Sequence, residues 1–156
     1  MNGIDSSFMF GGIMLHLIKL CVGAQSVEHL RVWQRARLDY MTRAGLPPEF
    51  AHHTRQTPKS ADALISGGSL YWVIGGFILA RQRLIAIRPE PDESGRVKCG
   101  LILAPEIIET EPYPRRPFQG WRYLKPEDAP RDLASDADQK DVPLFMRKEL
   151  ASLGLL

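Results

Sequence analysis

A chain of 156 residues is long enough to bury one hydrophobic core without disulfides or structural metals, so we expect a single domain. Hydrophobic residues make up 44% of the chain and charged residues 24%, a balance that excludes global disorder and a collagen-like architecture. The formal net charge of +2 is too small to indicate a nucleic-acid-binding protein by itself. Any such prediction depends on where the charges lie along the chain.

The start of the chain has no strong membrane or export signal. The apolar run over residues 8–18 is interrupted by glycines and His16 and is too short to span a bilayer. Residues 22–24 imitate a signal-peptide cleavage site, but Asp5 and the lack of basic residues at the start of the chain oppose this interpretation. We interpret residues 1–13 as a flexible N-terminal extension of a cytoplasmic protein, with the single domain spanning residues 14–156.

The first predicted element is a buried strand over residues 14–22, because apolar residues dominate this run and Gly23 follows it. Its Cys21 and the later Cys99 are too few for a disulfide framework, and each lies among apolar neighbours. We therefore expect both cysteines to be reduced and buried.

A helix is predicted over residues 27–44, with Ser26 as its N-cap and Gly45 at its C-terminal end. At about 100° per residue its apolar side chains fall on one side, which we expect to pack against the core. These side chains are Val27, Leu30, Trp33, Leu38, Tyr40 and Met41.

The next segment, residues 47–56, is predicted to be a loop that contains His52 and His53. Thr57 and Pro58 then have the cap and first-turn positions of a short second helix, which ends at the glycine pair 67–68.

The central part of the chain changes to the two-residue period of strands. We predict strands over 70–74 and 77–87, and a hairpin that joins the second of these through a turn at 89–95 to a strand over 97–103. Arg81 and Arg83 interrupt the apolar face of the 77–87 strand. Either this face emerges from the core at that point, or the two guanidiniums hold an anion.

The most distinctive stretch is residues 113–126, YPRRPFQGWRYLKP, which we call the basic aromatic loop. It is rich in proline, basic residues and aromatic rings and contains no acid. Guanidinium groups match phosphate oxygens, and flat rings stack on bases, so this composition is typical of a surface that binds nucleic acid or phosphate. The alternative is that the rings anchor the loop in the core and the arginines pair with nearby acids.

The chain is predicted to end with a last strand at 121–124, an acidic linker over 126–141 and a C-terminal helix over 142–154 that Asp141 caps. We expect this helix to cover part of the sheet or a symmetry-related partner.

Sequence motifs for particular chemistries are missing. Adjacent His52 and His53 side chains diverge, and no Cys or His pair has zinc-finger spacing, so we expect no metal. The glycine fingerprint of dinucleotide sites and the lysine-containing phosphate loop are also missing, so we expect no cofactor.

Several segments resemble a bacterial domain family of unknown function whose members have about 150 residues. The segments are HLIKLCVG, RQTPKSADAL, GGSLYWVI, ARQRL and the long EPYPRRPFQGWRYLKPEDAP motif, which contains the basic aromatic loop. The resemblance covers nearly everything from Met14 onward and implies no activity. The strand-rich centre is also similar in architecture to the small β-barrels of PUA-like RNA-binding proteins, an analogy without a matched motif.

We therefore expect an α+β fold, in which a compact, strongly bent sheet or small PUA-like β-barrel is flanked by helices. The leading functional hypothesis is a non-enzymatic nucleic-acid-binding module that favours RNA or single strands. Its predicted nucleic-acid or anion-binding residues are Arg81, Arg83, Arg115, Arg116, Trp121, Arg122, Tyr123 and Lys125.

Two other functions stay open. In the first, Arg115 and Arg116 clamp a phosphate- or carboxylate-bearing small ligand, and Glu109, Glu111 or a histidine transfers a proton. In the second, exposed rings form an assembly interface, which leaves a homo-oligomer open. Neither hypothesis includes a membrane partner.

Overall fold

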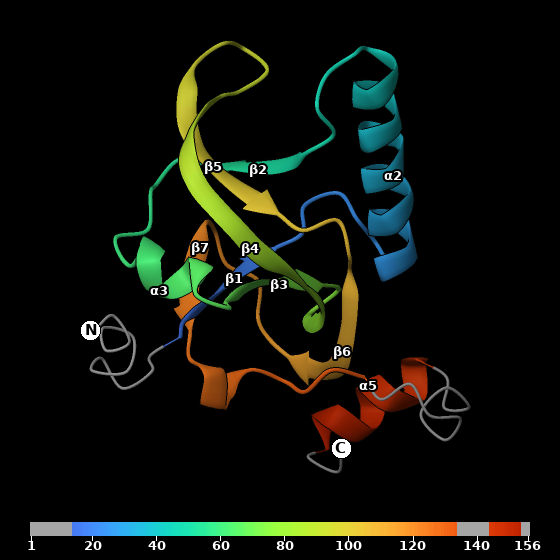
Figure 1. The fold of residues 1–156 in the computed structure, drawn as a ribbon. Coiled ribbons are helices and arrows are strands. Elements are labelled where there is room, and N and C mark those ends of the chain that lie inside the picture. Colours follow the sequence, from blue (N-terminus) through green and yellow to red (C-terminus); the bar gives the residue numbers. More distant parts are fainter. Residues whose placement is uncertain (1–13, 134–143, 154–156) are drawn as a thin grey trace.

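Residues 14–133 and 144–153 are described by a computed structural model, which shows a mixed α+β fold with a curved, unclosed sheet (Figure 1). The predicted α+β class with a strongly bent sheet is therefore confirmed. The predicted extension over residues 1–13, the cap at Asp141 and residues 134–143 lie outside the described part. The strands are β1 His16–Leu20, β2 Phe50–Thr54, β3 Ser69–Ile74, β4 Phe77–Pro91, β5 Val97–Leu103, β6 Ile108–Pro114 and β7 Trp121–Leu124. The helices are α2 Val27–Arg43, α3 Ala61–Ile65, α5 Leu144–Ser152 and the short 3-10 helix η1 Pro126–Asp128.

The sheet has the order β2-β5-β4-β3-β1-β7, with β6 beside the first half of β4. β1 runs parallel to β3, and the other neighbouring strands are antiparallel. β4 first pairs with β3 and β6 and then with β5. Its register shifts between Ile78 and Ala80 in the first region and between Leu84 and Ala86 in the second. Such bulges bend a strand and increase its twist, so β4 curves the whole sheet.

Several predicted elements are confirmed. β1, the β4–β5 hairpin and β7 lie where the two-residue period indicated them. α2 begins after Ser26, whose Oγ accepts a hydrogen bond from the His29 backbone N–H at 3.0 Å. Cys21 and Cys99 are both free and buried, as expected.

The prediction of a loop over residues 47–56 is wrong, because this segment contains β2, an edge strand paired with β5. Two adjacent histidines and only a few apolar residues conceal the strand pattern. Thr57 is also not the cap of the next helix: α3 begins at Ala61 after Ser60. The Ser60 backbone N–H instead donates to the Tyr123 hydroxyl, which ties this turn to β7.

The turn predicted at 89–95 begins later, because β4 continues to Pro91. Prolines are tolerated at this end of β4, since the strand has only β5 as a neighbour there. The first half of the predicted acidic linker also differs from the prediction. The Glu111 N–H donates to the Arg131 carbonyl at 2.8 Å and the Leu133 N–H to the Glu109 carbonyl at 2.9 Å, so residues 131–133 line β6.

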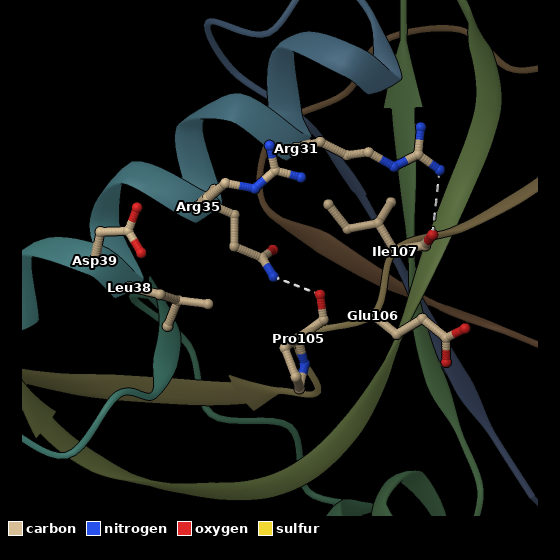
Figure 2. A pocket seen from close by; sticks show the side chains of 8 residues that line it. Arg31, Arg35, Leu38, Asp39, Pro105, Glu106 and Ile107 are labelled. Atoms are coloured by element: carbon tan, nitrogen blue, oxygen red, sulfur yellow. Dashed lines mark hydrogen bonds between the residues drawn. The ribbon is translucent and has the colours of Figure 1, made fainter. Parts of the chain in front are cut away.

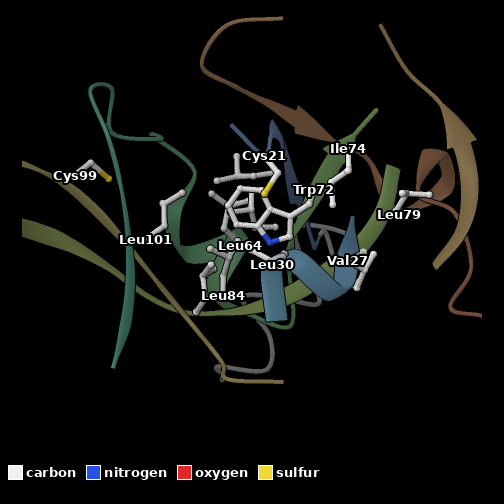
Figure 3. Packing of buried hydrophobic residues seen from close by; sticks show 14 residues of the cluster. Cys21, Val27, Leu30, Leu64, Trp72, Ile74, Leu79, Leu84, Cys99 and Leu101 are labelled. Atoms are coloured by element: carbon white, nitrogen blue, oxygen red, sulfur yellow. The ribbon is translucent and has the colours of Figure 1, made fainter. Parts of the chain in front are cut away.

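The core fills both faces of the sheet, because alternate residues of β1 and β3 point to opposite sides. Leu17 and Trp72 belong to the larger cluster, whereas Ile18 and Val73 belong to the smaller one. α2 covers the larger cluster with Val27 and Leu30 (Figure 3). The helix α5 lies beside β6, and its Lys148 ammonium lies 5.2 Å from the centre of the Phe77 ring (Figure 1).

The apolar face predicted for α2 is only partly buried. Trp33 and Tyr40 are 52% and 60% exposed, whereas the polar Gln34 is only 3% exposed. The reason is that Gln34 has buried partners. Its side-chain amide donates to the Pro105 carbonyl at 2.7 Å, and its carbonyl oxygen accepts a bond from Gln82.

Gln82 lies at the centre of this buried network. Its oxygen accepts the Trp72 indole N–H at 2.9 Å, and its amide donates to Gln34 and to the Ala104 carbonyl at 2.7 and 2.9 Å. The network thus joins α2, β3, β4 and the segment after β5. Each polar group of the Gln82 side chain is satisfied inside the protein, where an unpaired group would be costly.

We expect Gln82→Leu to lower the free energy of unfolding by about 2–3 kcal/mol, because it leaves buried groups of Trp72, Gln34 and Ala104 without this partner. Urea unfolding monitored by tryptophan fluorescence measures the loss. The matched control is Gln25→Leu at an exposed position, where a change within about 0.5 kcal/mol is expected. Equal stabilities of the two variants would show that the network contributes nothing.

Candidate anion-binding site

The strand β7 divides the basic aromatic loop between the two faces of the sheet. Trp121 packs against the larger core cluster, whereas Leu124 belongs to the smaller cluster, which Phe118 also contacts. Side chains alternate along a strand, so Trp121 and Tyr123 share one face, and Arg122 lies on the other. The loop therefore does not present its rings and cations as one surface.

Trp121 and Tyr123 anchor β7 to the segment between β2 and α3. The Trp121 indole N–H donates to the Gln56 carbonyl at 2.7 Å, and the Tyr123 hydroxyl accepts the Ser60 N–H at 3.1 Å. The two rings meet edge to face at 5.0 Å. Tyr123 is still 39% exposed, so one of its surfaces stays accessible.

The basic side chains of the loop lie mainly on the opposite face. The guanidiniums of Arg115 and Arg122 lie 5.3 and 4.5 Å from the centre of the Phe118 ring, within cation–π range. Arg116 and Lys125 are exposed. Within residues 14–133 and 144–153, none of these four cations forms an ion pair with a carboxylate.

Arg81 and Arg83 have different surroundings. Arg81 donates to both carboxylate oxygens of Asp132, at 2.7 and 2.8 Å, and to the Ser69 hydroxyl at 2.9 Å. The hydrogen bond from Arg81 lowers the pKa of Asp132 from its ordinary value. Arg81 thus already holds an anion of the protein itself. Arg83 is exposed, which indicates that this face of β4 emerges from the core.

A polar pocket of about 580 Å³ lies between β2 and β7, the two end strands of the curved sheet. We call it the seam pocket. One wall comes from Gln119, Gly120 and Trp121 of the basic aromatic loop. The other walls contribute four basic side chains: Lys19 from β1, His53 from β2, Arg55 after β2 and Lys98 from β5.

The charges that line the seam pocket favour the binding of anions. Of the residues that line it in the described part of the chain, none is acidic. Lys98 pairs with Asp92 at 3.0 Å, and no ion pair involves Lys19 or Arg55 within that same part. Burial lowers the pKa of Lys19, the expected response of an ammonium that lacks a partner anion.

A second pocket of about 320 Å³ lies beside α2, and we call it the α2 pocket. Leu30, Trp33, Phe50 and Trp72 give it apolar and aromatic walls, and His53 lines both this pocket and the seam pocket. Cys21 also lines it. Burial raises the pKa of the Cys21 thiol to about 11, so this group is not a thiolate nucleophile at neutral pH.

A third pocket, of about 340 Å³, lies between α2 and the segment after β5 (Figure 2). Arg31 and Arg35 of α2 line this pocket, and Asp39 and Glu106 line it as well. Arg31 pairs with Glu109 at 3.3 Å as well. Positive and negative charges are therefore balanced here, in contrast to the seam pocket.

The basic residues of the seam pocket were missed by sequence reasoning. Lys19, His53, Arg55 and Lys98 come from three separate parts of the chain, and no spacing or charge pattern in the sequence connects these parts. The strand β2, which places His53, was itself predicted as a loop. The basic aromatic loop, which contributes Gln119, Gly120 and Trp121, is the part of the pocket to which the sequence drew attention.

No three His, Cys, Asp or Glu side chains gather as a metal site within the described residues. In that part of the chain, no helix is long and apolar enough to cross a bilayer.

Residues 17–156 match the family described as Protein of unknown function (DUF1489). The match covers most of the chain, so the protein belongs to this family, and the predicted resemblance to a family of unknown function is confirmed. Neither the curated proteins nor the solved structures contain a match.

The half-buried His52 of the α2 pocket gives a pH-dependent prediction. Burial, together with Lys19 and His53, lowers the pKa of His52 to about 4. The unfolded chain binds the proton near pH 6.5 and the folded protein only near pH 4, so stability falls as the pH drops through this range.

We therefore expect His52→Phe to become more stable relative to wild type as the pH falls from 7 to 5, by up to about 1.4 kcal/mol per pH unit. Burial and Arg81 also lower the pKa of His16 to about 4. His16 is present in both proteins, so its contribution to the pH dependence of stability cancels in the comparison. Urea unfolding at pH 7 and pH 5 measures the difference. Parallel pH dependences would contradict the assignment of a neutral, half-buried His52.

Proposed function

We propose that this domain is a non-enzymatic module that binds single-stranded nucleic acid, with RNA favoured, and that the seam pocket is the centre of its binding surface. The observation that carries the proposal is the set of basic side chains Lys19, His53, Arg55 and Lys98 around a pocket whose described lining includes no acid. Phosphate groups are the ligands that such a pocket favours, because the half-buried Lys19 and the exposed Arg55 would each gain a counter-charge.

The surroundings of the pocket support a strand rather than a free phosphate ion. Trp121 forms part of the wall, and Tyr123 is accessible next to it. Aromatic rings beside cations suit bases that are not stacked in a duplex. Arg115, Arg116, Arg122 and Lys125 add positive charge beyond β7, mainly on the face opposite Trp121. A strand that leaves the pocket and passes around β7 would bring further phosphates to these cations.

The proposed similarity to PUA-like RNA-binding barrels comes from the strand-rich centre of the chain, and the sheet is curved but unclosed. This is an analogy of architecture, and it transfers no residue roles. It favours RNA among the nucleic acids, whereas the choice of the seam pocket depends on its charges alone.

One observation favours a second candidate function, the binding or turnover of a small phosphate- or carboxylate-bearing ligand. A volume of about 580 Å³ is in the usual range for small-ligand pockets, and the pocket brings Arg55 together with His53. The acids first considered for proton transfer are elsewhere, since Glu109 pairs with Arg31 and Glu111 with Arg131. A histidine is thus the candidate proton-transfer group in this alternative.

We expect wild-type protein to bind a fluorescein-labelled ten-nucleotide uridine RNA in an anisotropy titration, with affinity that falls steeply between 50 and 200 mM salt. Arg55→Glu reverses a charge in the seam pocket and should weaken binding about tenfold or more at 50 mM salt. Its salt dependence should also be shallower, because fewer counterions are released.

The matched control is Arg43→Glu, which makes the same charge change at an exposed position in the last turn of α2. Binding that is weakened equally by both variants would reflect net charge and would contradict a site in the seam. Arg115→Ala/Arg116→Ala tests the continuation along the loop, with a smaller loss expected. Competition by uridine monophosphate as strong as that by the RNA would favour the small-ligand alternative.

A further inference from the structure

The α2 pocket has the size and lining of a site for a flat, uncharged group. Leu30, Phe50 and Trp72 supply apolar walls, and the volume is about 320 Å³. Arg37 and Glu93 also line it, so its charges are balanced, whereas those of the seam pocket are not. A neutral, planar ligand group therefore fits this pocket better than a phosphate does.

Trp33 is the residue of this pocket that suggests a ligand, because its ring is exposed. It is 52% exposed, although it belongs to the face of α2 that also carries the buried Leu30. Its ring lies close to Gly23, where an added Cβ would come within 3.3 Å of the indole. The backbone at Gly23 has φ of +92°, which also disfavours other residues. The far edge of the indole thus lies against the backbone at Gly23, and the His29 ring lies 6.1 Å away. About half of the Trp33 side chain remains exposed and can meet a planar group.

The two pockets are adjacent. His53 lines both of them. Lys19 lines the seam pocket, yet its charge acts on Cys21 and His52, which line the α2 pocket. A ligand that combines a charged group with a planar group can therefore occupy both at once.

We propose that the two pockets form one site for an unpaired nucleotide, with a phosphate in the seam pocket and a base against Trp33 in the α2 pocket. This inference rests on the proposed function and specifies the ligand: a single strand with at least one base turned out of the stack. Stacking on an aromatic ring tolerates different bases, so the site discriminates single strands from duplexes rather than one sequence from another.

The test compares two fluorescein-labelled probes with the same number of phosphates, the ten-nucleotide uridine RNA and the same strand without bases. Wild type is expected to bind the RNA about tenfold more tightly than the abasic strand. Trp33→Ala is expected to lose up to about tenfold in affinity for the RNA, which is the whole wild-type preference for bases, and nothing for the abasic strand. Trp33→Phe keeps a stacking ring and should retain part of the preference.

Tyr40→Ala is the matched control, because Tyr40 is an exposed ring of the same helix that does not line the α2 pocket. It should bind both probes like wild type. Near-ultraviolet circular dichroism and thermal unfolding establish that each variant is folded.

The outcomes separate this inference from the proposed function. Equal wild-type affinities for the two probes, or a Trp33→Ala loss of the same size for both, would overturn the base pocket. In that case a loss of binding in Arg55→Glu would still support the proposed function. Absence of salt-dependent binding to either probe would refute the proposed function and this inference together.

Discussion

The fold depends on a buried hydrogen-bonded network at Gln82. Two glutamine amides, one indole and two backbone carbonyls satisfy one another where water does not reach. Since an amide in an apolar interior is tolerated only with its partners in place, the network permits essentially one position of α2 relative to the sheet. In that position α2 covers the larger core cluster, and Trp33 lies on the side of the helix near β2. Apolar contacts alone would constrain the helix less, because they are not directional.

The second constraint is the curvature of β4. Because its bulges turn the sheet, the end strands β2 and β7 approach each other without pairing. The Trp121 indole bridges the remaining distance to Gln56. Basic side chains from three separate parts of the chain then line the space that a closed barrel would fill with paired backbone. The pocket is thus a consequence of incomplete closure rather than of any local motif.

Sequence reasoning succeeded where a local pattern decides the structure. The cap at Ser26, the β4–β5 hairpin and the strand at Trp121 all follow from neighbouring residues. It failed at β2, because two histidines interrupt the strand pattern and the place of β2 in the sheet depends on β5. It also failed on α2, where rings predicted to be buried are exposed and Gln34 is buried instead. Of the predicted binding residues, Trp121 lines the seam pocket and the Tyr123 ring contacts Trp121, whereas Arg81 pairs with Asp132. Partners so distant in sequence leave no periodic signal.

The pairing of β1 with β7 has a consequence for synthesis of the chain. Lys19 lies opposite Trp121, so one side of β1 has no strand partner until β7 has been synthesised, more than 100 residues later in the chain. β3 can join its other side much earlier. A nascent or refolding chain therefore passes through a stage with an open strand edge, a template for pairing with other chains. The half-buried Lys19 on that edge is the kind of charged residue that opposes such pairing, so one side chain serves both the assembly of the sheet and the anion-binding pocket.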